Sequence, residues 1–319
     1  MHRAERRAGR VVLVTGAGSG IGWQIAADLA ARGDIVWAAA RRDEDLARLA
    51  TLPKVRPLKL DLRDAAACAA LPALLAAEAG GLDALVHNAG VGELGHLAAW
   101  SDADLQRLFD VNVFAPLRLT RELLPLLLAA RGRVVCIGSQ GGSITQPLYG
   151  PYTMSKHALE AFAACLRQEL APHGVAVAIV QPGAVATRIG ETALAANAAR
   201  LRATPPPFDT EARAWLERLQ SPPAPAPADA PESASHRKAA PPSKVSAAVL
   251  QALDETPPRA RHLVGTRWEG DRVIAALLER LLDAAASPSH GLTRDELVAR
   301  LDEAIAARGG AGPGGALPG

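Results

Sequence analysis

Aromatic side chains and cysteine are both scarce in this sequence. Aromatic residues make up 3% of the 319 residues, whereas apolar residues of all kinds make up 49%. Small and aliphatic side chains must therefore fill most of the core, which favours closely packed helices. The three cysteines, Cys68, Cys136 and Cys165, stand among apolar residues and show neither a metal-binding spacing nor a disulfide framework. This usage fits the reducing cytoplasm, and no metal site is predicted.

The sequence also lacks a long hydrophobic run and an excess of one charge. No uninterrupted apolar segment approaches the roughly 20 residues that span a bilayer, and no signal-peptide pattern precedes the first predicted strand. The formal net charge is only +2, and acidic and basic residues are interspersed apart from a short basic arm at residues 1–10. We therefore expect a cytoplasmic protein without a membrane span, and nucleic acid is not an expected partner.

What the sequence does contain is an alternation of short apolar strands and helical segments. Strands are predicted at residues 11–14, 35–40, 55–60, 82–86, 133–139 and 175–180. Helical patterns lie between them, at 23–31, at 64–79, from Asp110 to about Ala130, and from Pro151 onward. Six alternations predict an α/β fold of Rossmann type, a doubly wound parallel β-sheet with helices on both faces. The chain is long enough for one large domain of this kind.

The pattern weakens after residue 188. The core at 11–188 is followed by helical segments within 189–220 and by a Pro/Ala-rich insertion at 221–242, which we expect to be mobile. Residues 243–308 are expected to complete the single domain with C-terminal helical additions and a seventh strand at 261–265. Within them, Thr293 and Glu296 form a capping-box pattern. The glycine-rich tail at 309–319 is expected to be disordered.

A glycine-rich turn joins the first strand to the first helix. It reads Thr15-Gly16-Ala17-Gly18-Ser19-Gly20-Ile21-Gly22. Strand, glycine turn and helix form the context that a dinucleotide-binding fingerprint requires. The glycines let the backbone approach a pyrophosphate, and the start of the helix supplies free N–H groups and the positive end of its dipole. The turn therefore predicts a dinucleotide cofactor.

The residues after the second and third strands bear on which nucleotide is bound. Arg41 and Arg42 stand about 20 residues after the glycine turn, where the adenosine ribose lies in such folds. Two guanidinium groups suit a 2′-phosphate, so NADP(H) is the preferred prediction and NAD(H) is possible. The acidic residues that follow can partly neutralise them. Asp61 can accept a hydrogen bond from the adenine amino group or cap the next helix, and both alternatives stay open.

Tyr152 and Lys156 stand four residues apart on a predicted helix, so they share one helix face. A cation beside a phenol favours the phenolate and lowers the pKa of the tyrosine. Taken alone, such a pair is more often a core ring beside a solvated charge. Ser139, thirteen residues earlier, ends the fifth strand, and ligands of open parallel sheets bind at that end.

Together these motifs resemble the short-chain dehydrogenase/reductase family in its single-domain branch, and most closely its retinol- and hydroxysteroid-dehydrogenase-like members. The resemblance covers about residues 9–188 and, more loosely, 243–285. The residues that carry it, besides the glycine turn, are Asp61, Asn88-Ala89-Gly90, Asn112, Ser139, Tyr152-x-x-x-Lys156, Pro182-Gly183 and Thr187. An epimerase or dehydratase of the family's larger branch is disfavoured by the glycine spacing.

The resemblance implies a catalytic tetrad. Tyr152 is expected to act as general acid in reduction and as general base in oxidation, and Lys156 to lower its pKa and bind the nicotinamide ribose. Ser139 is expected to hydrogen-bond the carbonyl oxygen, and Asn112 to hold a water that relays protons. The implied cofactor contacts are Thr15, Gly16, Gly18, Ser19, Gly20, Ile21, Gly22, Arg41, Arg42, Asp61, Leu62, Asn88, Ala89, Gly90, Tyr152, Lys156, Pro182, Gly183, Val185 and Thr187.

The implied activity is NADP(H)-dependent interconversion of a ketone or aldehyde, expected to be apolar, and its alcohol. Helices at 119–130 and 158–170 resemble the family's subunit-contact helices, which implies a homodimer or homotetramer. The family often has Asn where this chain has His87, and a basic residue where it has Ser19. Residues 189–220 fall where the family has its substrate lid. A cofactor-sensing regulator or scaffold of the same fold is the alternative function.

Overall fold

The computed structural model describes residues 9–187, 189–221, 230–233 and 236–308, and at 189–192 it describes the backbone alone. The expectations for the tail, for residues 1–8 of the basic arm and for residues 222–229 and 234–235 of the Pro/Ala-rich insertion therefore lie outside the described residues. The chain divides into two compact units, Met1–Glu269 and Gly270–Gly319.

The first unit is built on a seven-stranded parallel sheet of order β3-β2-β1-β4-β5-β6-β7. This confirms the predicted fold class, and the segment expected as a seventh strand is β7, which pairs with β6. Because the order runs outward from β1 in both directions, the sheet has the switch point at which such folds bind ligands. The strands are β1 Val11–Val14, β2 Ile35–Ala40, β3 Val55–Lys59, β4 Ala84–His87, β5 Arg133–Ile137, β6 Ala176–Pro182 and β7 Arg261–Val264.

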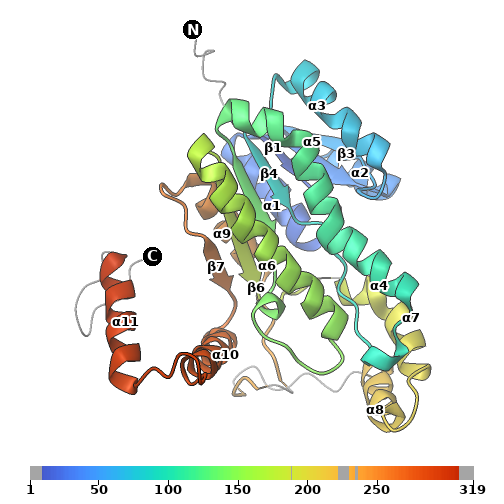
Figure 1. The fold of residues 1–319 in the computed structure, drawn as a ribbon. Helices are drawn as coiled ribbons and strands as arrows, with labels where there is room; N and C mark the ends of the chain where they lie inside the picture. The colour runs from blue at the N-terminus through green and yellow to red at the C-terminus, as the bar shows by residue number, and fades with distance from the viewer. Residues whose placement is uncertain (1–8, 188, 222–229, 234–235, 309–319) are drawn as a thin grey trace. The chain divides into compact units, whose positions relative to one another are not determined.

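Helices cover both faces of this sheet (Figure 1). One face carries α1 (Gly20–Arg32), α2 (Asp43–Leu49) and α9 (Pro242–Asp254), and α1 packs directly on α9. The other face carries α3 (Ala65–Ala79), α5 (Ala115–Ala130) and α6 (Gly150–Leu170). Helices α4 (Asp102–Phe109), α7 (Ile189–Arg202) and α8 (Asp209–Gln220) complete the unit beyond the strand ends.

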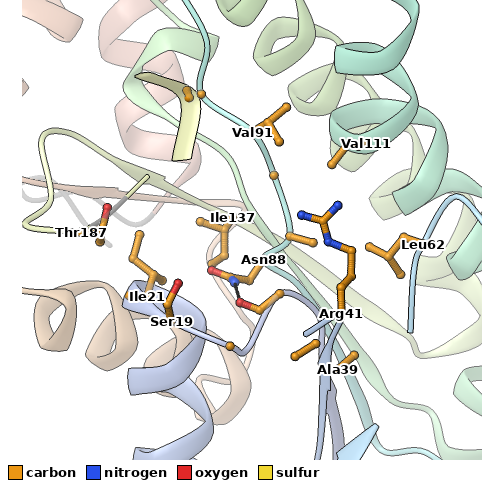
Figure 2. A pocket seen from close by; sticks show the side chains of 18 of the residues that line it. Ser19, Ile21, Ala39, Arg41, Leu62, Asn88, Val91, Val111, Ile137 and Thr187 are labelled. Carbon is orange, nitrogen blue, oxygen red and sulfur yellow. Dashed lines mark hydrogen bonds between the residues drawn. The ribbon is translucent and has the colours of Figure 1, made fainter. Parts of the chain in front are cut away.

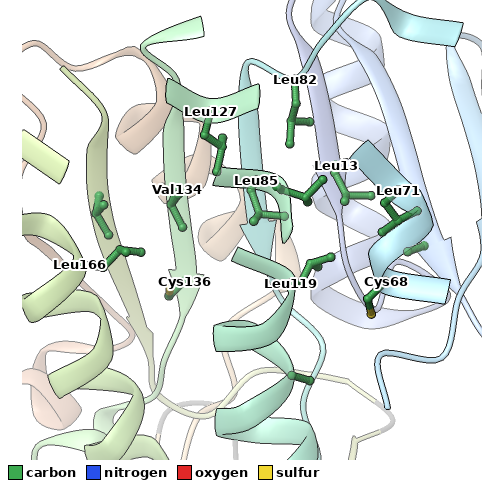
Figure 3. Close-up of a cluster of buried hydrophobic side chains, with 14 of the residues drawn as sticks. Leu13, Cys68, Leu71, Leu82, Leu85, Leu119, Leu127, Val134, Cys136 and Leu166 are labelled. Atoms are coloured by element: carbon green, nitrogen blue, oxygen red, sulfur yellow. The ribbon is translucent and has the colours of Figure 1, made fainter. Parts of the chain in front are cut away.

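Alternate residues of each central strand supply two separate cores. In β1, Leu13 packs under α3 and α5, whereas Val12 and Val14 pack under α1 and α9. Figure 3 shows the first of these clusters, in which side chains of β1, β4 and β5 meet Leu119 and Leu127 of α5. Burial on both sides explains why these strands are continuous apolar runs in the sequence.

One element boundary was predicted wrongly, because no helix opens at Asp110. Helix α4 begins after Ser101, whose hydroxyl caps it by accepting the Asp104 N–H at 3.2 Å. It then continues through a π-helical turn, Asp110–Phe114, into α5. The turn holds Asn112, whose buried side chain bonds both backbone groups of Val91, at 2.8 and 3.0 Å. A π-helical turn contains one residue more than an α-helical turn, and the two bonds to Val91 hold Asn112 within it. Such turns recur at functional sites.

The second unit holds most of α10 (Arg267–Ala285) and all of α11 (Arg294–Ala307). The capping box in front of α11 is confirmed, since the Thr293 hydroxyl accepts the Glu296 N–H and the Glu296 carboxylate accepts the Thr293 N–H. No helix in the described ranges is both long and apolar enough to cross a bilayer.

We predict that Leu119→Ala lowers the free energy of unfolding by about 2–5 kcal/mol, because it removes a side chain that is 0% exposed in the middle of the α5 core. Chemical denaturation followed by circular dichroism measures this change. Leu117→Ala on the same helix is the matched control, because Leu117 is 51% exposed, and its expected change is below about 0.5 kcal/mol. Similar losses in both variants would contradict the assigned core.

Candidate active site

A cleft of about 550 Å³ opens at the carboxyl ends of the parallel strands, and its volume falls in the range of small-molecule and cofactor sites. Figure 2 shows part of its lining, with Arg41, Asn88 and Thr187 drawn toward it from different elements. Among the predicted site residues, Thr15, Gly22 and Asn112 stand behind the lining. The predicted residues that line it are Gly16, Gly18, Ser19, Gly20, Ile21, Arg41, Arg42, Asp61, Leu62, Asn88, Ala89, Gly90, Ser139, Tyr152, Lys156, Pro182, Gly183, Val185 and Thr187.

The glycine turn is locked against the loop that follows β4. The Asn88 amide donates to the backbone oxygens of Thr15 and Gly16 at 2.9 and 3.0 Å. A side chain on Gly16 would put its Cβ 2.7 Å from the Cα of Ala89, and Gly16 also has a φ of +65°, which favours glycine. Gly22 likewise leaves no space for a side chain, because a Cβ there would lie 2.3 Å from the Gly16 oxygen. Thr15 and Gly22 therefore shape the turn from behind.

The N-terminus of α1 faces this cleft. The helix begins at Gly20, and the preceding Ser19 makes no side-chain cap to it. The first N–H groups of a helix have no partners within the helix, and the dipole adds positive potential there. Because Ser19, Gly20 and Ile21 all line the cleft, this end of it suits a phosphate or pyrophosphate.

The two arginines at the end of β2 differ in their surroundings. Arg41 makes no hydrogen bond or ion pair within the described part of the chain, and Figure 2 shows its side chain extending into the cleft. Arg42 is paired instead: its Nε lies 2.8 Å from Asp45 Oδ2, and its Nη1 lies 3.0 Å from Glu44 Oε1. Arg42 still lines the cleft, but its charge is partly neutralised, as the acidic residues that follow it allow. Sequence reasoning allowed partial neutralisation by the next two residues but missed Asp45.

Asp61 does not cap α3. The cap is Asp64, whose carboxylate accepts the Ala67 N–H at 3.0 Å. Asp61 lies against Arg63, with 2.6 Å between its Oδ2 and the Arg63 Nη2, and this hydrogen bond lowers the pKa of Asp61 to about 2. Its carboxylate therefore stays ionised at the wall of the cleft, where it can still accept a hydrogen bond.

Helix α6 brings the tyrosine and the lysine to the cleft on one face. The Lys156 Nζ lies 5.9 Å from the centre of the Tyr152 ring and donates to the Ile137 oxygen at 3.0 Å. Ser139 follows β5, hydrogen-bonds Tyr152, and accepts the Gly141 N–H at 3.0 Å. The three predicted groups thus converge at one place, where hydroxyls of two residues can meet one substrate oxygen.

The protonation of this pair differs from the sequence-based expectation. Burial raises the pKa of the Tyr152 phenol, and its hydrogen bond with Ser139 only opposes that effect. Burial also lowers the pKa of the Lys156 ammonium to about 8. The predicted lowering of the tyrosine pKa by Lys156 is therefore wrong for the protein alone, because a dry site disfavours both charged forms. The phenol is protonated at neutral pH, as a proton donor must be.

Asn112 supports this pair from behind. Its side chain is buried, and besides the two bonds to Val91 it donates to the Ser155 hydroxyl at 3.0 Å. That hydroxyl in turn donates to the Tyr152 backbone oxygen at 2.7 Å. Both N–H groups of the Asn112 amide are therefore bonded to protein atoms. Through these bonds the side chain links the loop after β4 to α6.

The loop after β6 is fixed by a residue that sequence reasoning missed, Glu269 at the start of α10. Its side chain is 0% exposed, and its carboxylate accepts the Ala184 N–H at 2.8 Å and pairs with Arg237. A Cβ on Gly183 would lie 2.0 Å from its Oε2, so the glycine makes room for the carboxylate. Glu269 lies 85 positions from Ala184 in a stretch without a motif, so no signal in one sequence points to it.

Two further charged residues of the cleft wall were also missed. Glu93, after β4, accepts hydrogen bonds from Arg107 of α4 at 2.6 and 3.0 Å, and both residues line the cleft. Glu93 also pairs with the buried Arg200 of α7. Salt bridges in the cleft wall beyond the glycine turn thus join α4 to α7. Glu93, Arg107 and Arg200 belong to no sequence motif, so the sequence alone did not indicate them.

The comparisons with known proteins identify the family to which the chain belongs. The family model described as short chain dehydrogenase matches residues 10–198, more than half of the chain. The NADPH-dependent 3-dehydrocapnine reductase of Ornithobacterium rhinotracheale is 37% identical over 189 residues, which cover 56% of this chain and 67% of that protein. The chain belongs to the short-chain dehydrogenase/reductase family, and it is an NAD(P)-dependent oxidoreductase.

Solved structures show the same fold. A short-chain dehydrogenase from Streptomyces avermitilis matches with a TM-score of 0.72 and 29% identity over 90% of this chain and 100% of that one. A short-chain dehydrogenase/reductase from Burkholderia phymatum in complex with NAD matches with a TM-score of 0.70 and 26% identity over 86% of this chain and 94% of that one.

The buried ammonium of Lys156 predicts a specific pH dependence of stability. Its pKa is about 8 in the folded protein and 10.5 as the ordinary value, so between these limits the unfolded chain binds the extra proton. Stability must therefore rise as pH increases from about 8 to 10.5. Relative to a Lys156→Met variant, which lacks this group, the wild-type free energy of unfolding should gain roughly 2–3 kcal/mol over that window. Urea unfolding at constant ionic strength checks this, and parallel pH profiles would contradict it.

Proposed function

We propose that the protein is an NADP(H)-dependent oxidoreductase that interconverts a ketone or aldehyde and the corresponding alcohol. The observation that carries the proposal is the convergence of Ser139, Tyr152 and Lys156 on a cleft that also holds the glycine turn and the unpaired Arg41. A proton donor and a second hydrogen-bond donor lie together near a helix N-terminus that suits a phosphate. This arrangement suits hydride transfer with a nucleotide cofactor better than a reaction that needs no cofactor.

The residues present fit a nicotinamide dinucleotide. The N–H groups at the start of α1 suit the pyrophosphate, Asp61 suits the adenine amino group, and Arg41 suits a phosphate on the adenosine ribose. Lys156 suits the nicotinamide end because it lines the cleft beside Tyr152. The loop carrying Val185 and Thr187 suits it too, because Thr187 lies opposite Gly20 of the glycine turn. When bound, the cofactor supplies or accepts the hydride.

The chain's own part in the reaction is to hold and move one proton. In reduction, Ser139 and Tyr152 would donate hydrogen bonds to the substrate carbonyl oxygen and stabilise the negative charge that develops on it. Tyr152 would then give up its proton, and the ammonium of Lys156 would stabilise the phenolate formed. In oxidation the same phenolate would accept the alcohol proton. Asn112 would keep the tyrosine in place through Ser155.

The NADP(H) preference rests on Arg41 and on the name of the NADPH-dependent relative, whereas the Burkholderia protein was solved with NAD. Cytoplasmic location, an apolar substrate and a homodimer or homotetramer stay predictions. A cofactor-sensing regulator is less well supported, because such a role needs neither Ser139 nor the Tyr152–Lys156 pair, and all three line the cleft.

Tyr152→Phe should reduce NADPH-dependent turnover of a panel of ketones and aldehydes by at least about 1,000-fold, because it removes the proton donor, and leave cofactor affinity within a fewfold. Turnover is followed by the absorbance of reduced nicotinamide. Tyr149→Phe is the matched control, since its ring is 6.4 Å from that of Tyr152 but does not line the cleft. Undiminished turnover in Tyr152→Phe would refute the mechanism.

Arg41→Ala should weaken NADPH binding by roughly 10- to 100-fold and leave NADH binding nearly unchanged, because it removes a charge-assisted contact that only the 2′-phosphate makes. Isothermal titration calorimetry of both nucleotides tests this. Arg42→Ala should change NADPH affinity far less, because Arg42 is already paired with two carboxylates. Equal losses for NADPH and NADH in Arg41→Ala would argue against a phosphate contact.

A further inference from the structure

Helix α6 carries a buried carboxylate one turn beyond the tyrosine and the lysine of the cleft. Glu160 follows Lys156 by four positions, as Lys156 follows Tyr152, so the three side chains stand in a row along one face of the helix. Glu160 is only 8% exposed and stands behind the cleft lining. Because its carboxylate has lost most of its water, protein groups must supply the hydrogen bonds.

Both oxygens of this carboxylate have a partner on a neighbouring strand. Its Oε1 accepts a hydrogen bond from Gln181 Nε2 of β6 at 2.9 Å, and its Oε2 accepts one from Arg261 Nε of β7 at 3.0 Å. Gln181 is itself 4% exposed, and its Nε2 also donates to the Ser143 hydroxyl at 3.0 Å. The Gln181 amide thus joins the carboxylate to the segment between β5 and α6.

That segment is the loop that carries Ser139. A Cβ on Gly138 would lie 3.2 Å from Glu160 Oε1, and a Cβ on Gly142 would lie 3.0 Å from Glu160 Cγ. The Glu160 side chain therefore packs against the loop both before and after Ser139. Because Ser139 also hydrogen-bonds Tyr152, a shift of this loop would move its hydroxyl relative to the phenol.

We propose that Glu160 is a positioning residue that sets the place of the Ser139 hydroxyl. Its carboxylate holds the Gln181 amide, and that amide holds Ser143 at the far side of the loop. The Ser139 oxygen is thereby kept beside the Tyr152 phenol. The inference rests on the proposed function, in which Ser139 donates to the substrate carbonyl oxygen. A contact behind the cleft can matter to the rate, because a misplacement of about 1 Å can cost on the order of 100-fold.

This role depends on the hydrogen bonds of Glu160 rather than on its negative charge. The charge is paired with Arg261, and its attraction raises the pKa of Lys156 only against the larger, opposing effect of burial. A glutamine side chain has the same shape and keeps one oxygen that can accept the Gln181 hydrogen bond. Glu160→Gln therefore removes the charge and spares the positioning contact, whereas Glu160→Leu removes both.

The test is the single-turnover rate at which excess enzyme oxidises NADPH with the carbonyl compound of the panel that reacts fastest. Glu160→Leu should lower this rate by about 10- to 100-fold and leave NADPH affinity within about threefold, because the cleft lining is intact. Glu160→Gln should stay within about threefold of the wild type. Glu169→Leu, at an exposed position of the same helix, is the matched control and should stay within about twofold. A loss in Glu160→Gln as large as that in Glu160→Leu would overturn the inference.

A double-mutant cycle with Ser139→Ala shows whether the loss acts through that hydroxyl. In this background Glu160→Leu should cost less than about twofold, because no hydroxyl is left to misplace. An equal fractional loss with and without the hydroxyl contradicts a positioning role. If Glu160→Leu folds poorly, Ser143→Ala removes only the far end of the contact and should lower the rate by about threefold, again only when Ser139 is present. A wild-type chain that reduces none of the panel overturns the proposed function instead.

Discussion

Burial of the parallel strands on both faces is the constraint on which the rest of this molecule depends. Their side chains pack into two hydrophobic cores, one under α3, α5 and α6 and one under α1, α2 and α9. Polar chemistry can then gather only where the strands end, and seven parallel strands end at the same edge. The glycine turn, Asn88, Ser139 and the loop after β6 are all extensions of strand ends, which is why residues far apart in sequence meet in one cleft.

The same cleft is an unfavourable place for charge. Tyr152 and Lys156 each lose hydration there, and this loss stabilises the neutral form of each side chain relative to its charged form. A lysine near the surface would keep its hydration, but its ammonium would not lie beside the Tyr152 ring. Hydrogen bonds to Ile137, Ser139 and Ser155 hold the two residues in place despite this cost. The cost of burying these two groups is a local loss of stability, of the kind that proteins accept at sites of activity.

Much of the fold follows from the sequence, because apolar runs such as Val11–Val14 and glycine-rich turns are local signals that packing does not overrule. The cleft follows as well, since motifs at strand ends meet once the strands are parallel. What the sequence could not give was set by contacts between distant segments. The pairing of Arg42 with Asp45 and the π-turn at Asn112 each depend on a partner that the motif does not contain. Likewise, the direction of the Tyr152 pKa depends on burial, which spacing does not encode.

Glu269 shows how such distant contacts restrict the history of a sequence. Its carboxylate fills space that Gly183 and Gly265 leave free, since a Cβ at either position would come within 2.0 or 2.3 Å of its Oε2. Alanine at Gly183 would therefore require the Glu269 carboxylate to be displaced, whereas alanine at Gly265 would also meet Gln140 Nε2 at 2.8 Å. Loss of the glutamate would in turn leave the Ala184 N–H and Arg237 without their buried acceptor. Gly183 and Glu269 are therefore coupled through one small volume, and the effects of substituting them are expected to be non-additive.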